Sequence, residues 1–198
     1  MRESGSRRVS ARGRLVEMDG RRWVPAFRGA EEKGERLAEE IQGEQLSKPL
    51  FRIAAADDLP AIIALLADDE MSRGRELPDQ PLLPAYLTAW EEMAADPHQM
   101  PIVAQEGGRP VGYLQLSLIP GLAFRGMKRG LIESVRVASD RRGRGIGEGL
   151  MAYAIQQAKN AGCHLVQLTS TNDRTDAHRF YERLGFEATH TGFKLRLD

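Results

Sequence analysis

The sequence has one cysteine, no net charge and no long apolar run, and each of these features excludes a class of protein. A single cysteine in 198 residues excludes a disulfide scaffold and a zinc site built on paired cysteines. It also makes a reducing, cytoplasmic setting the default. Lys and Arg number 28, as do Asp and Glu, so we expect no general affinity for nucleic acid or a membrane surface. Because no stretch of about 18 apolar residues is present, no segment is expected to span a bilayer.

The chain changes character near residue 48. Residues 1–48 are dense in charge and poor in large apolar residues, and they show no sustained period of 3.6 or 2. We therefore expect a charged, flexible N-terminal extension, followed by one folded domain at residues 49–198. An Arg- and Ser-containing start is also typical of a transit peptide, although the acids from Glu17 onward disfavour this interpretation.

The apolar periodicity after residue 50 predicts helices and strands in alternation. Strands are predicted at residues 51–54, 101–105, 111–119, 131–137, 164–170 and 192–197. One helix is predicted to follow a cap at Asp57-Asp58, and two more are predicted at residues 146–161 and 177–184. A further helix is predicted after Pro84, with its buried face formed by Tyr86, Leu87, Trp90 and Met93. The order β α α β β β α β α β predicts a mixed α/β fold on one sheet.

A glycine-rich turn, Arg142-Gly143-Arg144-Gly145-Ile146-Gly147, separates the strand at 131–137 from the helix at 146–161. N–H groups at a helix start carry the positive end of the dipole, and glycines let a ligand approach, so this turn is typical of a pyrophosphate site. A tight turn that merely needs positive φ has a similar composition. The spacing fits neither a P-loop nor G-x-G-x-x-G, and the next strand does not end in an acid, so a dinucleotide oxidoreductase is disfavoured.

Two motifs make residues 50–198 resemble the GNAT superfamily of acetyl-coenzyme A (acetyl-CoA)-dependent N-acetyltransferases. The first is VRVASDRRGRGIG, with Arg142, Gly145 and Gly147 at the defining positions. The second is AHRFYERLGF, from Ala177 to Phe186. The resemblance implies a single mixed, mostly antiparallel sheet flanked by helices. It also implies an enzyme that moves an acetyl group from acetyl-CoA to a primary amine, without a metal.

The resemblance also implies where acetyl-CoA binds. Backbone N–H groups of the glycine-rich turn, from Arg142 to Gly147, would hold the pyrophosphate, and the pantetheine arm would lie along Val135, Arg136 and Val137, where a backbone N–H polarises the thioester carbonyl. Many relatives carry an asparagine that contacts this arm. Here Asn172 is the candidate, with Asp173 and Thr175 as alternatives. Seven basic residues between 125 and 144 support an anion site, and a solvated charge run is the alternative. They are Arg125, Lys128, Arg129, Arg136, Arg141, Arg142 and Arg144.

Tyr181 is the candidate general acid. A phenol, with a pKa near 10, can give a proton to a departing thiolate and yet stay neutral at pH 7. The alternative is that Tyr181, like its neighbour Phe180, is an ordinary core residue of the helix. The catalytic role rests on the resemblance more than on the chemistry of the phenol.

Glu133 is the candidate base, taking a proton from the acceptor's ammonium through a water. It stands within the apolar strand LIESVRV, where a carboxylate is costly unless it is paired or faces a wet cavity. Strict alternation places Glu133 on the apolar face with Val135 and Val137, and a bulge could re-aim it. A structural ion pair with Arg136 or Lys128 is the alternative role.

The acceptor is expected to be cationic, because residues 57–106 contain eleven acids and two bases. A polyamine, an aminoglycoside-like amine or a peptide amine would suit this charge, and a solvated helix surface is the alternative explanation. The acids that would attract it are Asp68, Asp69, Glu70, Glu76 and Asp79. The rival function is a non-catalytic acyl-CoA sensor or interaction module on the same fold, and either form is expected to be a monomer or a homodimer.

No metal site or thiol nucleophile is expected. The four histidines show no metal-ligand spacing and no Ser or Cys partner typical of a triad. Cys163 lies between a helix end and the strand at 164–170, as a small core residue would.

Overall fold

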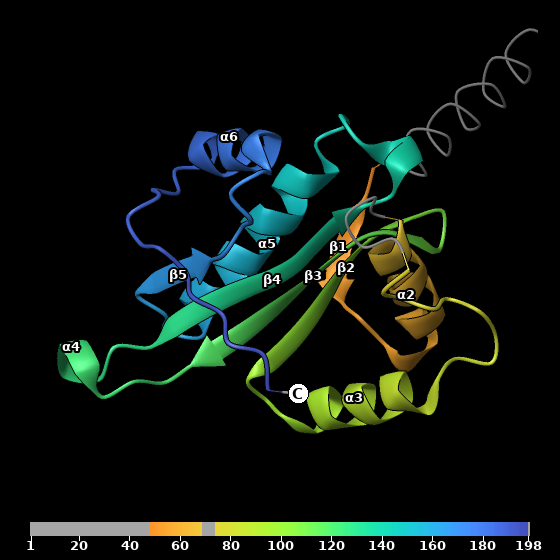
Figure 1. Cartoon of the computed structure of the whole chain (residues 1–198), viewed down its shortest axis with the longest axis horizontal. Coiled ribbons are helices and arrows are strands. Elements are labelled where there is room, and N and C mark those ends of the chain that lie inside the picture. The colour runs from red at the N-terminus through yellow and green to blue at the C-terminus, as the bar shows by residue number, and fades with distance from the viewer. Residues whose placement is uncertain (1–47, 69–73, 198) are drawn as a thin grey trace, which may run out of the picture. The chain divides into compact units, whose positions relative to one another are not determined.

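The computed structural model describes residues 48–68 and 74–197 (Figure 1). The chain divides into two units, Met1–Gly43 and Glu44–Asp198, and all described residues belong to the second. The predicted N-terminal extension lies almost entirely outside the described residues. Within the described ranges, no helix is both long enough and apolar enough to cross a membrane.

Five strands form one sheet in the order β1-β2-β3-β4-β5. Neighbouring strands are antiparallel from β1 (Leu50–Ile53) through β2 (Gln99–Glu106) and β3 (Arg109–Ile119) to β4 (Arg129–Val137). β5 (Leu165–Leu168) joins β4 in parallel. The β2-β3 hairpin turns at Gly107 and Gly108, whose φ values of 53° and 82° explain the glycine pair in the sequence. The predicted mixed fold on one sheet is confirmed.

Helices cover both faces of the sheet (Figure 1). On one face α5 (Ile146–Asn160) packs its fully buried Leu150 and Met151 against Leu114 of β3. α6 (Thr175–Arg183) lies on the same side, because Phe180 packs against this core. On the other face α2 (Leu59–Ala67) packs against Tyr113. α3 (Pro84–Ala95) covers that face as well. The remaining described elements are short helical turns at Ala56–Asp58 (η1), Ala123–Gly126 (α4) and Ser139–Arg141 (η3).

β4 contains a bulge at Ser134. The paired residues step from Gln115 and Glu133 to Tyr113 and Arg136, so β4 advances three residues where β3 advances two. Ser134 carries the strain, with φ of 56° in the left-handed region. The extra residue reverses the alternation of side chains along β4, and this decides which residues face the site described below.

Three predicted elements differ from the structure. The strand predicted at 164–170 is shorter and partly exposed rather than buried, because β5 is at the edge of the sheet. No described residue of the predicted strand at 192–197 is in a strand, and Phe193 and Leu197 are each 93% exposed. Alternation defines which side chains share a face, but it does not supply a partner strand. α3 buries none of its residues, and Leu87 is 48% exposed.

The buried carboxylate of Asp58 joins β1 to the start of α2. It accepts hydrogen bonds from the two terminal nitrogens of Arg52 at 2.6 and 2.9 Å and from the backbone N–H of Ala55 at 2.8 Å. Asp58 is the N-cap residue of α2, but its side chain makes no bond to that helix; the bond from Ala55 caps the preceding turn η1 instead. The hydrogen bonds from Arg52 and Ala55, and the charge of Arg52, hold the pKa of Asp58 below its usual range, although burial opposes them.

We expect Asp58→Asn to destabilise the fold by about 2–3 kcal/mol at neutral pH, because Arg52 loses its charged partner at a largely buried site. A lowered carboxyl pKa gives stability that is present above about pH 4 and is lost as the pH falls through the folded-state value. Denaturant unfolding at pH 7 and at about pH 3 measures the difference, which should shrink at the lower pH. Asp57→Asn, at an exposed neighbour, is the control. A difference that is equal at both pH values would contradict the assignment.

Candidate functional site

A cavity of about 450 Å³ lies between the carboxyl end of β4 and the start of α6. Its lining comes from two segments, one at the end of β4 and the following turn, the other leading into α6. The residues are Val135, Arg136, Val137 and Arg142 from the first, and Asp173, Arg174, Thr175, Asp176 and Ala177 from the second. Four residues predicted to bind the donor therefore line one cavity. Of the three candidates for the pantetheine contact, Asp173 and Thr175 line it.

The glycine turn at the start of α5 forms an open cradle. Gly143 and Gly145 have φ values of 75° and 77°, a left-handed conformation that side chains disfavour. A Cβ at either position would meet no atom within 4 Å. Gly145 is also the N-cap residue of α5, a helix of 15 residues, so the first N–H groups of that helix lie at this turn. The open space at these glycines admits a phosphate group, and the positive end of the α5 dipole favours its negative charge.

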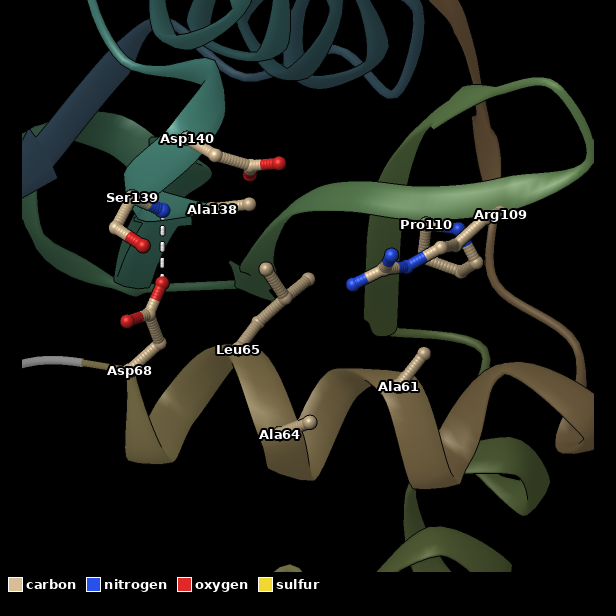
Figure 2. A pocket seen from close by; sticks show the side chains of 9 residues that line it. All are labelled: Ala61, Ala64, Leu65, Asp68, Arg109, Pro110, Ala138, Ser139 and Asp140. Carbon is tan, nitrogen blue, oxygen red and sulfur yellow. Dashed lines mark hydrogen bonds between the residues drawn. The ribbon is translucent and has the colours of Figure 1, made fainter.

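The two arginines of this turn, Arg142 and Arg144, differ in their hydrogen bonds. Arg142 donates from Nε to the carbonyl oxygen of Val137 at 3.2 Å and from Nη2 to that of Asp68 at 2.9 Å. The Asp68 carboxylate in turn accepts from the backbone N–H of Ser139 at 2.7 Å, at the edge of a second cavity on the α2 side (Figure 2). Arg142 therefore fixes the shape of the turn and ties it to the end of α2. Arg144 is exposed and has no partner among the described residues, which leaves it available to an anion.

The basic cluster predicted between residues 125 and 144 is dispersed in the structure. Lys128 donates from Nζ to the carbonyl of Ala161 at 3.0 Å. Arg141 pairs with Glu106 at 3.1 Å and with Asp140 at 2.8 Å. Of the seven, Arg136 and Arg142 line the cavity, together with Arg174. Arg174 comes from the segment before α6, and the sequence analysis did not include it.

Glu133 lies on the face opposite Val135 and Val137, and not with them as predicted. Val135 and Val137 pack with Ile132 into the α5 core, whereas Glu133 is exposed and pairs with Gln115 on the α2 and α3 side. The expectation from strict alternation was wrong because the extra residue at Ser134 shifts the later side chains to the other face. No ion pair joins Glu133 to another described residue, so the structural alternative proposed from sequence is not observed.

Tyr181 is half-buried on α6 between two other aromatic rings. Its ring centroid lies 5.2 Å from that of Phe180 and 6.1 Å from that of Phe186, both in edge-to-face geometry. Burial raises the pKa of Tyr181, and the positive charges of Arg174 and Arg136 oppose this shift. Both arginines line the cavity between β4 and α6, whereas Tyr181 itself is not among the lining residues. A raised pKa keeps the phenol protonated at neutral pH, as a general acid requires.

A row of polar side chains on β3 was missed in the sequence analysis. Tyr113, Gln115 and Ser117 alternate with buried leucines and share the face that carries Glu133. Burial, helped by the negative charge of Glu133, raises the pKa of Tyr113 to about 12. The signal was present in the sequence YLQLSL, whose period of 2 is typical of a strand with one polar face.

Cys163 is partly buried against the α5 core, and burial raises the pKa of its thiol. A raised pKa disfavours the thiolate that a nucleophile requires. In the part of the chain that the structure describes, no three His, Cys, Asp or Glu side chains are grouped so that they could hold a metal ion.

Comparison with known proteins gives one consistent family. A family model described as "Acetyltransferase (GNAT) family" matches residues 60–186, which include the glycine turn and the cavity. An aminoalkylphosphonate N-acetyltransferase from Salmonella typhimurium is 31% identical over 147 residues, 74% of this chain and 90% of that protein. A solved protein from Bacillus halodurans, described as a transcriptional regulator, is 44% identical with a TM-score of 0.73, covering 75% of this chain and 99% of that one. A complex of the aminoglycoside N-acetyltransferase AAC(6')-Iy with CoA, 18% identical, shares the fold with a TM-score of 0.59 over 75% of this chain and 99% of that one.

Proposed function

Because the chain belongs to the GNAT acetyltransferase family, and so is an acetyl-CoA-dependent N-acetyltransferase, we propose that it transfers the acetyl group directly to an amine at the cavity between β4 and α6. The observation that carries this proposal is the cavity itself, because residues from both sequence motifs line it. We place the catalytic domain at residues 49–198 and the extension at residues 1–48 outside it.

In this proposal acetyl-CoA occupies the glycine turn at the start of α5 and the cavity. Backbone N–H groups from Gly143 to Gly147 bind the pyrophosphate, and Arg144 adds a positive charge. Val135 to Val137 lie along the pantetheine arm, and the turn at 172–175 contacts it through the predicted Asn172 or through Asp173 and Thr175, which line the cavity. Bound acetyl-CoA supplies an acetyl group activated as a thioester.

In this proposal Tyr181 acts as the general acid and Glu133 as the general base. Tyr181 lies on the α5 side of the sheet and donates a proton to the departing thiolate. Glu133 lies on the α2 and α3 side and accepts a proton from the ammonium through a water. Donor and acceptor then approach β4 from opposite faces of the sheet, and the bulge at Ser134 is what puts Val135 and Val137 on the other face from Glu133.

We expect Glu133→Gln to lower kcat by about 100-fold, since the amide cannot accept a proton. KM for acetyl-CoA should stay near its wild-type value, because the change is on the acceptor face. Steady-state thiol release at saturating amine measures both quantities. Glu187→Gln, at an exposed position, is the control. An unchanged kcat would remove Glu133 from the mechanism.

The acceptor in this proposal is a cationic small-molecule or peptide amine. Two of the acids proposed to attract it have partners within the chain, since Asp68 accepts from Ser139 and Glu76 accepts from the Tyr86 hydroxyl at 3.0 Å. Asp69 and Glu70 lie outside the described residues. Asp79 and the exposed Glu133 are then the acids that act on an ammonium. Polyamines should be better acceptors than amino acids or aminoalkylphosphonates at low salt, and the reverse order would refute a cationic preference.

A non-catalytic acyl-CoA sensor is the second candidate, and one observation favours it. The 44% identical Bacillus halodurans protein is described as a transcriptional regulator. Thiol release from acetyl-CoA with a panel of amines distinguishes the two functions. Amine-dependent release supports the enzyme, whereas CoA binding without release for any amine supports the sensor.

A further inference from the structure

Gln115 lies directly opposite Glu133 across the β3-β4 pair. Side chains of such partners stand on the same face with Cβ atoms about 5 Å apart. Glu133 is exposed and Gln115 is partly exposed, so solvent reaches both residues. The pair comes immediately before the bulge at Ser134. A second polar side chain therefore lies beside the proposed base.

A hydrogen-bond network fixes which end of the Gln115 amide is held. The amide nitrogen of Gln115 donates to Oε1 of Gln99 at 2.9 Å, and the hydroxyl of Ser117 donates to the same oxygen at 2.8 Å. Ser117 is only 8% exposed, so its hydroxyl depends on this bond. With Nε2 of Gln115 held by Gln99, its oxygen Oε1 is the end left for a ligand.

The hydroxyl of Ser117 supports the same orientation. Because it donates to Oε1 of Gln99, that oxygen faces both Ser117 and Gln115. A flipped Gln115 would place two amide oxygens against each other without a proton between them.

We propose that the Glu133 carboxylate and Oε1 of Gln115 form a two-oxygen receptor that makes the enzyme select amines over alcohols. This inference rests on the proposed function of the site. An ammonium has several N–H donors and can bond to both oxygens at once, whereas an alcohol has one O–H and presents lone pairs to the second oxygen. Gln115 is thus a specificity-determining residue that holds the acceptor nitrogen while Glu133 takes its proton.

The test measures acceptor binding and turnover separately. Putrescine, or butanediol as the matched diol, is titrated calorimetrically into the full chain saturated with CoA, and thiol release is followed with acetyl-CoA. In Gln115→Met, the dissociation constant and the KM for putrescine should rise about 10- to 100-fold, as expected for a lost hydrogen bond to a charged group. KM for acetyl-CoA should not change. Gln156→Met, on the exposed face of α5, is the control.

Two outcomes would overturn the inference. One is a Gln115→Met protein that binds putrescine as tightly as wild type. The other is a wild-type protein that binds putrescine no more tightly than butanediol. Putrescine binding that depends on Gln115 without any thiol release would uphold the receptor and reject the enzymatic function, so the two proposals can fail independently.

Discussion

Replacing Tyr181 by phenylalanine is expected to lower kcat by about 100- to 1000-fold, which is the range for a lost general acid. The ring would still pack between Phe180 and Phe186, so the fold and KM for acetyl-CoA should be preserved. The Tyr181→Phe variant lacks only the phenol O–H that would protonate the departing thiolate. Steady-state thiol release at saturating amine measures the effect.

The pH dependence of wild type provides a second test of the same residue. A general acid must be protonated, and the pKa of Tyr181 is raised by burial above its ordinary value near 10. Activity should therefore show no loss attributable to Tyr181 up to about pH 10 and should fall only as the pH rises further. Tyr153→Phe, which removes a hydroxyl from a partly buried tyrosine of α5, is the matched control. Equal kcat values in the two variants would contradict the role of Tyr181.

Replacing Gly145 by glutamate should weaken CoA binding by at least about 100-fold. The position is open, with no atom within 4 Å of a Cβ, so the new side chain would occupy the cradle rather than clash with the protein. Its carboxylate would lie beside the phosphates, where like charges about 4 Å apart repel by several kcal/mol at an effective dielectric of about 20. Calorimetric titration with CoA gives the dissociation constant directly.

Gly145→Ala separates charge from backbone strain. Both variants impose a side chain on a residue with φ of 77°, which costs about 1–2 kcal/mol, but only glutamate adds a charge. The alanine variant should therefore lose much less CoA affinity than the glutamate variant. Similar dissociation constants for the two variants would mean that the cradle does not hold the phosphates.

Features encoded by nearby residues could be predicted from the sequence. The β2-β3 hairpin follows from Gly107-Gly108, and the start of α5 follows from the glycine turn, because both depend on backbone conformations that few other residues adopt. The resemblance also implied that the end of β4 and the segment before α6 contact one pantetheine arm. The cavity between them is lined by Val135, Arg136, Val137 and Arg142 from the first motif and by Ala177 from the second.

Features that depend on pairing between distant segments could not be predicted. Glu133 is separated from Val135 and Val137 by a one-residue bulge whose register belongs to two strands together. Arg142 is held by Asp68, 74 residues earlier in the chain, so its part in shaping the turn was invisible in the motif. Asp58 suggested a helix cap by position, yet its strongest partner is Arg52 on the preceding strand. The network that orients Gln115 likewise joins two strands.

Rapid-quench analysis with acetyl-labelled acetyl-CoA tests whether the acetyl group passes directly to the amine. We predict that label never becomes covalently attached to the protein, and that it appears in the acetylated amine within a single turnover once amine is added. Label retained on the protein before amine addition, on Cys163 or any other residue, or no label in any amine, would contradict direct transfer.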